Sequence, residues 1–236
     1  MPLYEKPVRQ LMHDIVADLG LRPGQVFDRE QVLDWFRSRY LLVKEGTIAA
    51  HLIRLSTNAK SRLHYNVRSD GSDDLFLQVD GSRFRLYEPG TDPAPITFTN
   101  ASTPSSIQPS LEVDASEASQ LAYEHDLRDY LARNLRLIEP GLTLYADEGI
   151  TGVEFPAGGR YIDILAVDRD GGYVVIELKV SKGYDRVVGQ LLRYMGWIEQ
   201  HHAEPGQRVR GVIVAKEITD DLKLACSRVQ GIQLFA

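Results

Sequence analysis

Two apolar segments separated by a tight turn constrain the fold of this 236-residue chain more than any other feature. The segments RYIDILAVD (160–168) and YVVIELKV (173–180) are rich in Ile and Val, and the sequence Asp170-Gly171-Gly172 between them is typical of a turn. They predict a β-hairpin. Each strand nevertheless carries a carboxylate, Asp163 or Glu177, between large aliphatic neighbours. Because buried strands rarely contain an acid that lacks a partner, these two acids are expected to do more than pack.

The acids of this hairpin, with one lysine, predict a metal site. Residues two apart in a strand share a face, so Glu177 and Lys179 lie together and Asp163 lies on the neighbouring strand. Two carboxylates on adjacent strands suit Mg²⁺, and the lysine supplies a positive charge to a water molecule or a phosphate. The spacing D-x13-E-x-K is the signature of the PD-(D/E)XK nuclease superfamily. The alternative interpretation is a simple cross-strand ion pair between Asp163 and Lys179.

The segment around the hairpin resembles the NucS-type endonucleases of that superfamily, from about residue 123 to residue 213 and most closely over residues 159–197. The resemblance implies six active-centre residues: Asp163, Glu177, Lys179, the upstream acid Glu124 of YEHDLRDYL, and Gln190 and Tyr194 of GQLLRY. It implies Mg²⁺ as the cofactor, with Mn²⁺ as a substitute. The expected metal ligands are Asp163, Glu177, Glu124 and the backbone carbonyl of Leu178. Glu154 either approaches the metal from the neighbouring strand or is an exposed strand residue.

The N-terminal part predicts three helices followed by a hairpin. Apolar residues recur at helical spacing from Val8 to Leu19, a second helix starts at Asp28 with Gln31 as its capping partner, and a third starts near Thr47. The segments LFLQV (75–79) and RFRLY (83–87) flank a short turn. This order is that of a winged helix-turn-helix. Residues 44–66 also resemble the winged-helix modules attached to bacterial restriction-type proteins, including the HARE-HTH-like group.

Charge is distributed unevenly along the chain, whose net charge is −6. The segment from Arg37 to Arg68 contains seven Lys or Arg residues and one acid, which is the excess that a phosphate-binding surface requires. The third helix would then enter a DNA groove. The expected DNA-binding residues are Thr47, His51, Arg54, Asn58, Lys60, Arg62, His64 and Arg68. The alternatives are a solvated helix face and a winged helix that docks onto another protein.

Composition divides the chain into three expected parts. Residues 95–119 are rich in Ser, Thr, Pro and Ala, which is typical of a flexible linker. We expect a winged helix-turn-helix DNA-binding domain at 1–95, the linker at 96–116 and the nuclease domain at 117–236. Beside the hairpin, the nuclease domain should contain helices at 117–135, 184–202 and 219–229 and strands at 142–150, 209–216 and 232–236. This order predicts an α/β (mixed α+β) fold, a restriction-endonuclease-like mixed sheet flanked by helices.

These features together predict a metal-dependent DNA endonuclease that serves restriction or defence, with DNA selected by the winged helix. Cutting both strands requires two active sites, so a homodimer is expected. The alternatives are a repair nuclease that acts on mismatched or branched DNA, and a catalytically silent DNA-binding regulator. The chain has no stretch of about 18 apolar residues and no phosphate-binding glycine loop, and Cys226 is its single cysteine. We therefore expect a cytoplasmic protein with neither a membrane association nor a nucleotide cofactor.

Overall fold

The computed structural model describes residues 6–97, 115–179 and 184–236. Contacts between residues divide the chain into two units, residues 1–105 with 146–151 and residues 106–145 with 152–236. Most of the expected linker, residues 98–114, lies outside the described residues, as does Val180 at the end of the expected hairpin. Among the residues that are described, no helix is both long enough and apolar enough to span a membrane.

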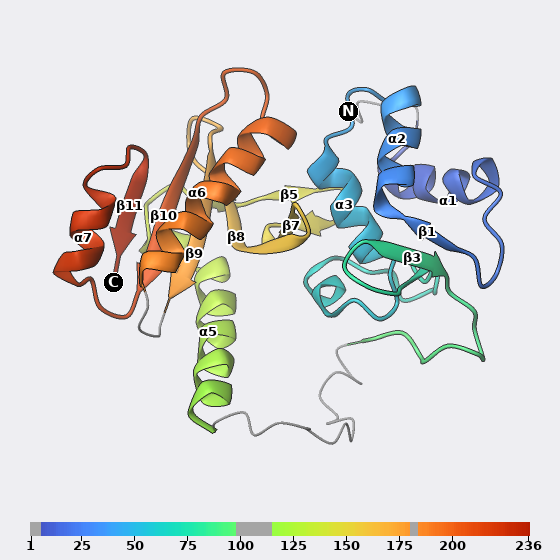
Figure 1. The fold of residues 1–236 in the computed structure, drawn as a ribbon, viewed down its shortest axis with the longest axis horizontal. Coiled ribbons are helices and arrows are strands. Elements are labelled where there is room, and N and C mark those ends of the chain that lie inside the picture. Colours follow the sequence, from blue (N-terminus) through green and yellow to red (C-terminus); the bar gives the residue numbers. More distant parts are fainter. Residues whose placement is uncertain (1–5, 98–114, 180–183) are drawn as a thin grey trace. The chain divides into compact units, whose positions relative to one another are not determined.

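In its described residues, the first unit consists of α-helices and a small antiparallel sheet (Figure 1). Its helices are α1 (Val8–Asp18), α2 (Arg29–Arg39) and α3 (Glu45–Arg54), followed by the 3-10 turn η1 (Lys60–His64). The strands β1 (Val26–Asp28), β2 (Phe76–Gln78) and β3 (Arg83–Leu86) pair in the order β1-β3-β2. The three helices and the later hairpin lie where the sequence predicts them, whereas β1 was not predicted. Its three residues are too short a segment for apolar alternation to be visible.

The core of the first unit forms where the apolar stripes of the helices meet the sheet. Each of the three strands contributes one phenylalanine: Phe27, Phe76 and Phe84. The ring centroid of Phe27 lies 5.3 Å from that of Phe76 and 6.0 Å from that of Phe84. They pack with apolar residues of the helices, among them Leu11 and Phe36, which are fully buried. At the start of α2, Gln31 Oε1 accepts a 2.9 Å hydrogen bond from the backbone N–H of Asp28, as the capping pattern predicts. Burial of these apolar surfaces is the main stabilising contribution.

The second unit is built on one mixed sheet, which confirms the predicted α/β class. Its helical elements are α5 (Ala115–Arg133), η2 (Leu135–Leu137), α6 (Tyr184–His201) and α7 (Asp220–Cys226). Its strands are β4 (Thr143–Leu144), β7 (Val153–Ala157), β8 (Arg160–Val167), β9 (Tyr173–Lys179), β10 (Val209–Ala215) and β11 (Ile232–Phe235). The order is β11-β10-β9-β8-β4, with β7 also paired to β8. Pairing is parallel from β9 to β11 and antiparallel around β8.

Helices cover both faces of this sheet. Ile164 and Ile176, paired across β8 and β9, pack with Leu131 of α5 on one face. On the other face, a Cβ added to Gly211 of β10 would lie within 3 Å of Leu191 of α6, so the glycine permits close approach of that helix. Residues alternate between the faces along each strand. Glu177, which pairs with Ile213, therefore lies on the face that α6 covers.

The expected continuous strand at 142–150 is wrong. The chain forms β4, then leaves the sheet as a separate hairpin, β5 (Ala146–Asp147) and β6 (Ile150–Thr151), before it returns as β7. Glu148 and Gly149 have φ values of 44° and 83°, the left-handed conformation that a two-residue hairpin turn requires. The hairpin groups with the first unit, where Glu148 accepts a 2.7 Å hydrogen bond from the backbone N–H of Val8. Asp147, Glu148 and Gly149 interrupt the apolar residues of this segment, and this was the visible sign of a turn.

Gly149→Ala should destabilise the first unit. Gly149 has a left-handed φ, and an added Cβ would lie 2.7 Å from Nη1 of Arg54. Conformational strain and the clash together should lower the free energy of unfolding by about 1–2 kcal/mol. The measurement is urea denaturation. Gly171→Ala is the matched control, because Gly171 has φ 80° but nothing lies within 4 Å of its added Cβ. Equal losses in both variants would show that the contact with Arg54 contributes nothing.

Candidate active site

The two strand acids meet across β8 and β9. The register pairs Ile164 with Ile176, so Asp163 and Glu177 face each other at the next position. Oδ2 of Asp163 accepts a 2.8 Å hydrogen bond from the backbone N–H of Leu178, and Oε1 of Glu177 lies 3.4 Å from the backbone N of Asp163. Each carboxylate is thus anchored to the other's strand. The period-2 pattern of two apolar strands is sufficient to produce this juxtaposition.

Both carboxylates are held where ionisation is unfavourable. Glu177 is 2% exposed, and its burial raises its pKa, with the negative charge of Asp163 as a second cause. Burial also raises the pKa of Asp163, opposed by the hydrogen bond from Leu178 and by the positive charge of Arg128. The strands therefore concentrate negative charge in a poorly solvated place. A divalent cation bound there would relieve that cost.

Gln190 and Tyr194 of α6 support Glu177 from behind. Gln190 Nε2 donates a 2.7 Å hydrogen bond to Oε2 of Glu177 and lies 3.5 Å from the hydroxyl of Tyr194. Tyr194 is 2% exposed, and its burial raises the pKa of its hydroxyl. The two residues are one helical turn apart, so they follow one face of α6. The structure thus brings together the Gln and Tyr that the sequence resemblance singled out, and it places them against the deeper acid.

The six residues named from the resemblance gather around one cavity of about 480 Å³, which five of them line and Tyr194 supports from behind through Gln190. Its walls are Glu124, Asp163, Glu177, Leu178, Lys179, Arg186, Val187 and Gln190. Nζ of Lys179 lies 3.9 Å from Oε1 of Glu124, which α5 contributes. Lys179 pairs with Glu124 and not with Asp163, so the simple cross-strand ion pair is not what forms. The sequence reasoning missed Arg186, although its place one helical turn before Gln190 was a visible signal.

Glu154 is partly buried and is therefore not the exposed strand residue of one interpretation, whereas its approach to the metal stays a prediction. It lies opposite Asp163 on β7, with φ 47°, and its carboxylate contacts Nη1 of Arg128 in an ion pair. Arg128, 5% exposed, also donates a 2.8 Å hydrogen bond to Asp129. Glu154 therefore holds a buried arginine beside the acids. The left-handed backbone of Glu154 coincides with the one gap in the pairing of β7 with β8 between Val153 and Phe155.

The donor set fits Mg²⁺. Within the described part of the chain, no group of three or more His, Cys, Asp or Glu side chains is arranged to hold a metal ion. Mg²⁺, however, is commonly bound through one or two carboxylates and keeps several waters. Asp163 and Glu177 supply two hard oxygen ligands that are already fixed by hydrogen bonds, and Glu124 lines the same cavity. The cavity leaves room for the remaining waters.

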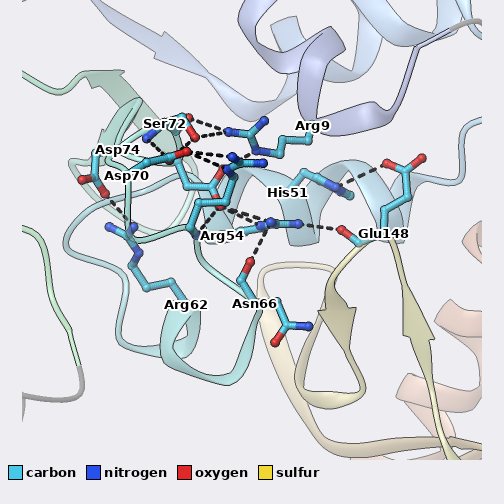
Figure 2. Close-up of polar contacts among 11 residues, drawn as sticks. Arg9, His51, Arg54, Arg62, Asn66, Asp70, Ser72, Asp74 and Glu148 are labelled. Carbon is cyan, nitrogen blue, oxygen red and sulfur yellow. Dashed lines mark hydrogen bonds and ion pairs between the residues drawn. The ribbon is translucent and has the colours of Figure 1, made fainter.

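Four of the eight expected DNA-binding residues are inside the first unit, and that part of the expectation is wrong. Thr47, His51, Arg54 and Arg62 are at most 6% exposed. Figure 2 shows Arg54 within a polar network: its guanidinium donates to Asp73 and to the backbone carbonyls of Glu148 and Asn66. Asp73 is fully buried, so Arg54 serves as its counter-ion. A side chain engaged in this way cannot reach a base edge.

His51 and Arg62 are likewise bonded inside the first unit. Nδ1 of His51 donates a 2.9 Å hydrogen bond to the backbone carbonyl of Thr47, and burial lowers the pKa of His51 to about 4. The ring is therefore neutral at neutral pH and adds no positive charge. Arg62, 1% exposed, forms a 2.7 Å ion pair with Asp74 (Figure 2). The basic segment thus meets the acids at 70–74, which follow it in the sequence.

The other four expected residues lie nearer to solvent. Asn58 is exposed, and its amide exchanges two 2.8 Å hydrogen bonds with the backbone of Gln78. Lys60 is exposed, and His64 is partly buried. Arg68 is exposed and forms an ion pair with Asp70 at 2.7 Å. Charge counting along the sequence therefore overstated the basic surface, because several of these cations are neutralised within the unit.

Two family models match the chain, one in its N-terminal part and one in its C-terminal part. Residues 123–232 match the family described as the endonuclease NucS C-terminal domain, and residues 7–86 match a domain of unknown function, DUF7669. The match supports a NucS-like nuclease. The second match names neither a winged helix nor the HARE-HTH-like group, so that resemblance is not confirmed.

Curated relatives show the same similarity over the second part of the chain. Endonuclease NucS of Pyrococcus abyssi is 31% identical over 121 residues, 51% of this chain and 44% of that protein. Endonuclease NucS of Frankia alni is 35% identical over 118 residues, 50% of this chain and 47% of that protein. A crystal structure of a repair endonuclease from Pyrococcus abyssi aligns with 28% identity and a TM-score of 0.39, covering 48% of this chain and 45% of that one. The chain thus matches less than half the length of these relatives.

Proposed function

We propose that this protein is a metal-dependent DNA endonuclease whose second unit hydrolyses phosphodiester bonds. The observation that carries the proposal is the cavity in which Asp163 and Glu177 are anchored to each other's strands beside Lys179. The match of residues 123–232 to the NucS C-terminal domain supports it. Mg²⁺ is the proposed cofactor, with Mn²⁺ as a substitute, because the donors are carboxylate oxygens.

The residues of the cavity would divide the chemistry among them. Asp163, Glu177 and the backbone carbonyl of Leu178 would hold Mg²⁺, with Glu124 close by. When bound, the ion polarises the phosphate and lowers the pKa of a water molecule. Lys179 would stabilise the negative charge that develops on the phosphate, because its ammonium lines the same cavity. Gln190 would keep Glu177 in place, since it already occupies one oxygen of that carboxylate.

The comparisons favour DNA repair over restriction as the role. The curated relatives described above are both the endonuclease NucS, which fits the repair alternative better than the expected restriction role. We therefore propose mismatched or branched DNA as the substrate. We further propose that residues 1–95 form a winged helix, since three helices precede a β-hairpin there, and that it contacts DNA through residues other than those of α3, which are buried from Gly46 to Arg54. A homodimer would supply the two active sites that cleavage of both strands requires.

The proposal predicts cleavage with a clear substrate preference. With Mg²⁺ or Mn²⁺, we expect the full chain to cut mismatched or forked duplexes faster than intact plasmids, whether these are unmodified, methylated or hydroxymethylated. Cleavage is followed on gels, and Asp163→Ala is the control for a contaminating nuclease. Preference for one class of plasmid would favour restriction instead. DNA binding without any cleavage would favour the silent regulator.

A further inference from the structure

One face of α6 carries polar side chains at every fourth residue. Arg186, Gln190 and Tyr194 are each one helical turn apart, so they form a row along the helix. Gln190 contacts Glu177, and Tyr194 is buried behind it. Arg186, the first of the row, is exposed and lines the same cavity. The row therefore runs from a buried hydroxyl at one end to an exposed cation at the edge of the cavity.

The negative charge of the cavity walls makes a cation at the position of Arg186 favourable for binding a phosphate. Glu124, Asp163 and Glu177 contribute three carboxylates to its walls, which repel an approaching phosphate. Lys179 is the second basic side chain that lines the cavity, and its ammonium already lies 3.9 Å from Glu124. Arg186 stands in the first turn of the 18-residue helix α6, where the helix dipole adds partial positive charge. An anion is thus attracted to the Arg186 side of the cavity.

We propose that Arg186 binds a backbone phosphate of the DNA strand that enters the cavity. This inference rests on the proposed nuclease function and deepens it by naming a substrate contact. A guanidinium presents parallel donors that match two phosphate oxygens, and its charge persists at every relevant pH. The residue is exposed before DNA arrives, so binding requires no rearrangement of the carboxylates. Arg186 thereby holds the strand while the neighbouring acids and Lys179 face the bond to be cut.

The test compares cleavage kinetics of the full chain with those of Arg186→Ala and Arg186→Lys on a mismatched duplex. Loss of one charged contact should raise KM about tenfold and change kcat little. The slope of log affinity against log salt should become shallower by about 0.9. Arg186→Lys should recover part of the loss. Arg228→Ala is the matched control, because Arg228 is an exposed arginine of the same unit that does not line the cavity.

Failure of this inference is distinguishable from failure of the proposed function. If the wild type cuts and Arg186→Ala cuts with unchanged KM and salt dependence, the phosphate contact is refuted while the nuclease stands. If the wild type does not cut, the affinity of each variant for DNA is measured by fluorescence anisotropy with a labelled mismatched duplex and Ca²⁺. Weaker binding by Arg186→Ala than by Arg228→Ala supports the contact, and equal binding by the two variants overturns it.

Discussion

Glu177→Gln is expected to abolish metal-dependent cleavage and, at the same time, to stabilise the metal-free protein. Activity should fall by about a thousandfold or more, because the variant loses one of two charged ligands for the metal. Stability should rise because Glu177, 2% exposed, faces a second carboxylate. The amide can still accept the hydrogen bond from Gln190, so the packing is retained. The amide needs no proton when the chain folds, whereas the buried carboxyl of Glu177 must take one up, and removing this cost should contribute on the order of 2 kcal/mol at neutral pH.

The sign of the pH dependence follows from the direction of the pKa shift. Burial and the charge of Asp163 raise the pKa of Glu177 above its ordinary value of 4.5. The folded state therefore favours the protonated carboxyl, and its ionised form lowers the free energy of unfolding. Metal-free wild type should lose stability as the pH rises above that ordinary value, whereas Glu177→Gln should lose less. Added Mg²⁺ should reverse the loss in the wild type alone, because a ligand that binds only the native state stabilises it.

Thermal unfolding with and without Mg²⁺, at several pH values, measures these effects. Glu199→Gln on α6 is the matched control, because Glu199 is exposed and its substitution removes the same charge. It should leave cleavage, and the response to Mg²⁺, unchanged. An equal Mg²⁺ response in Glu177→Gln and the wild type would contradict the assignment of Glu177 as a metal ligand.

Arg54→Ala is expected to unfold or strongly destabilise the first unit, not to alter DNA selectivity. The guanidinium of Arg54 is 5% exposed and bonds to Asp73, whose carboxylate is fully buried. It also donates 2.6 and 2.7 Å hydrogen bonds to the carbonyls of Glu148 and Asn66. Truncation would leave Asp73 with Arg9 as its remaining arginine partner and two carbonyls without this donor. Breaking a buried pair of this kind should cost about 3–5 kcal/mol.

Chemical denaturation of the full chain provides the measurement, with Arg68→Ala as the matched control. Arg68 forms its ion pair with Asp70 at the surface, where both side chains are at least 50% exposed. Its removal should change stability by about 0–1 kcal/mol. If Arg54→Ala kept wild-type stability but relaxed the preference for one DNA sequence, the original view of Arg54 as a base-reading residue would be restored.

The candidate active site shows how far local sequence pattern reaches. Two apolar strands joined by a short turn pair in one register, so Asp163 and Glu177 had to become neighbours once the hairpin formed. The four-residue spacing of Gln190 and Tyr194 likewise placed both on one face of a helix. Glu124 was found through resemblance alone, because its approach to Lys179 depends on how α5 packs against the sheet.

The sequence alone determined the helices, the hairpin of β8 and β9 and the pairing of its acids, because these follow from spacings of two to four residues along one segment. Only the tertiary structure decided which cations face solvent. Arg54 and Arg62 were counted as a basic surface, yet they are neutralised by Asp73 and Asp74. The contacts of residues 146–151 could not be predicted either, since their partners Val8 and Arg54 are distant in the sequence. Burial and long-range pairing depend on how the folded chain packs, so they cannot be predicted from the periodicity of the sequence.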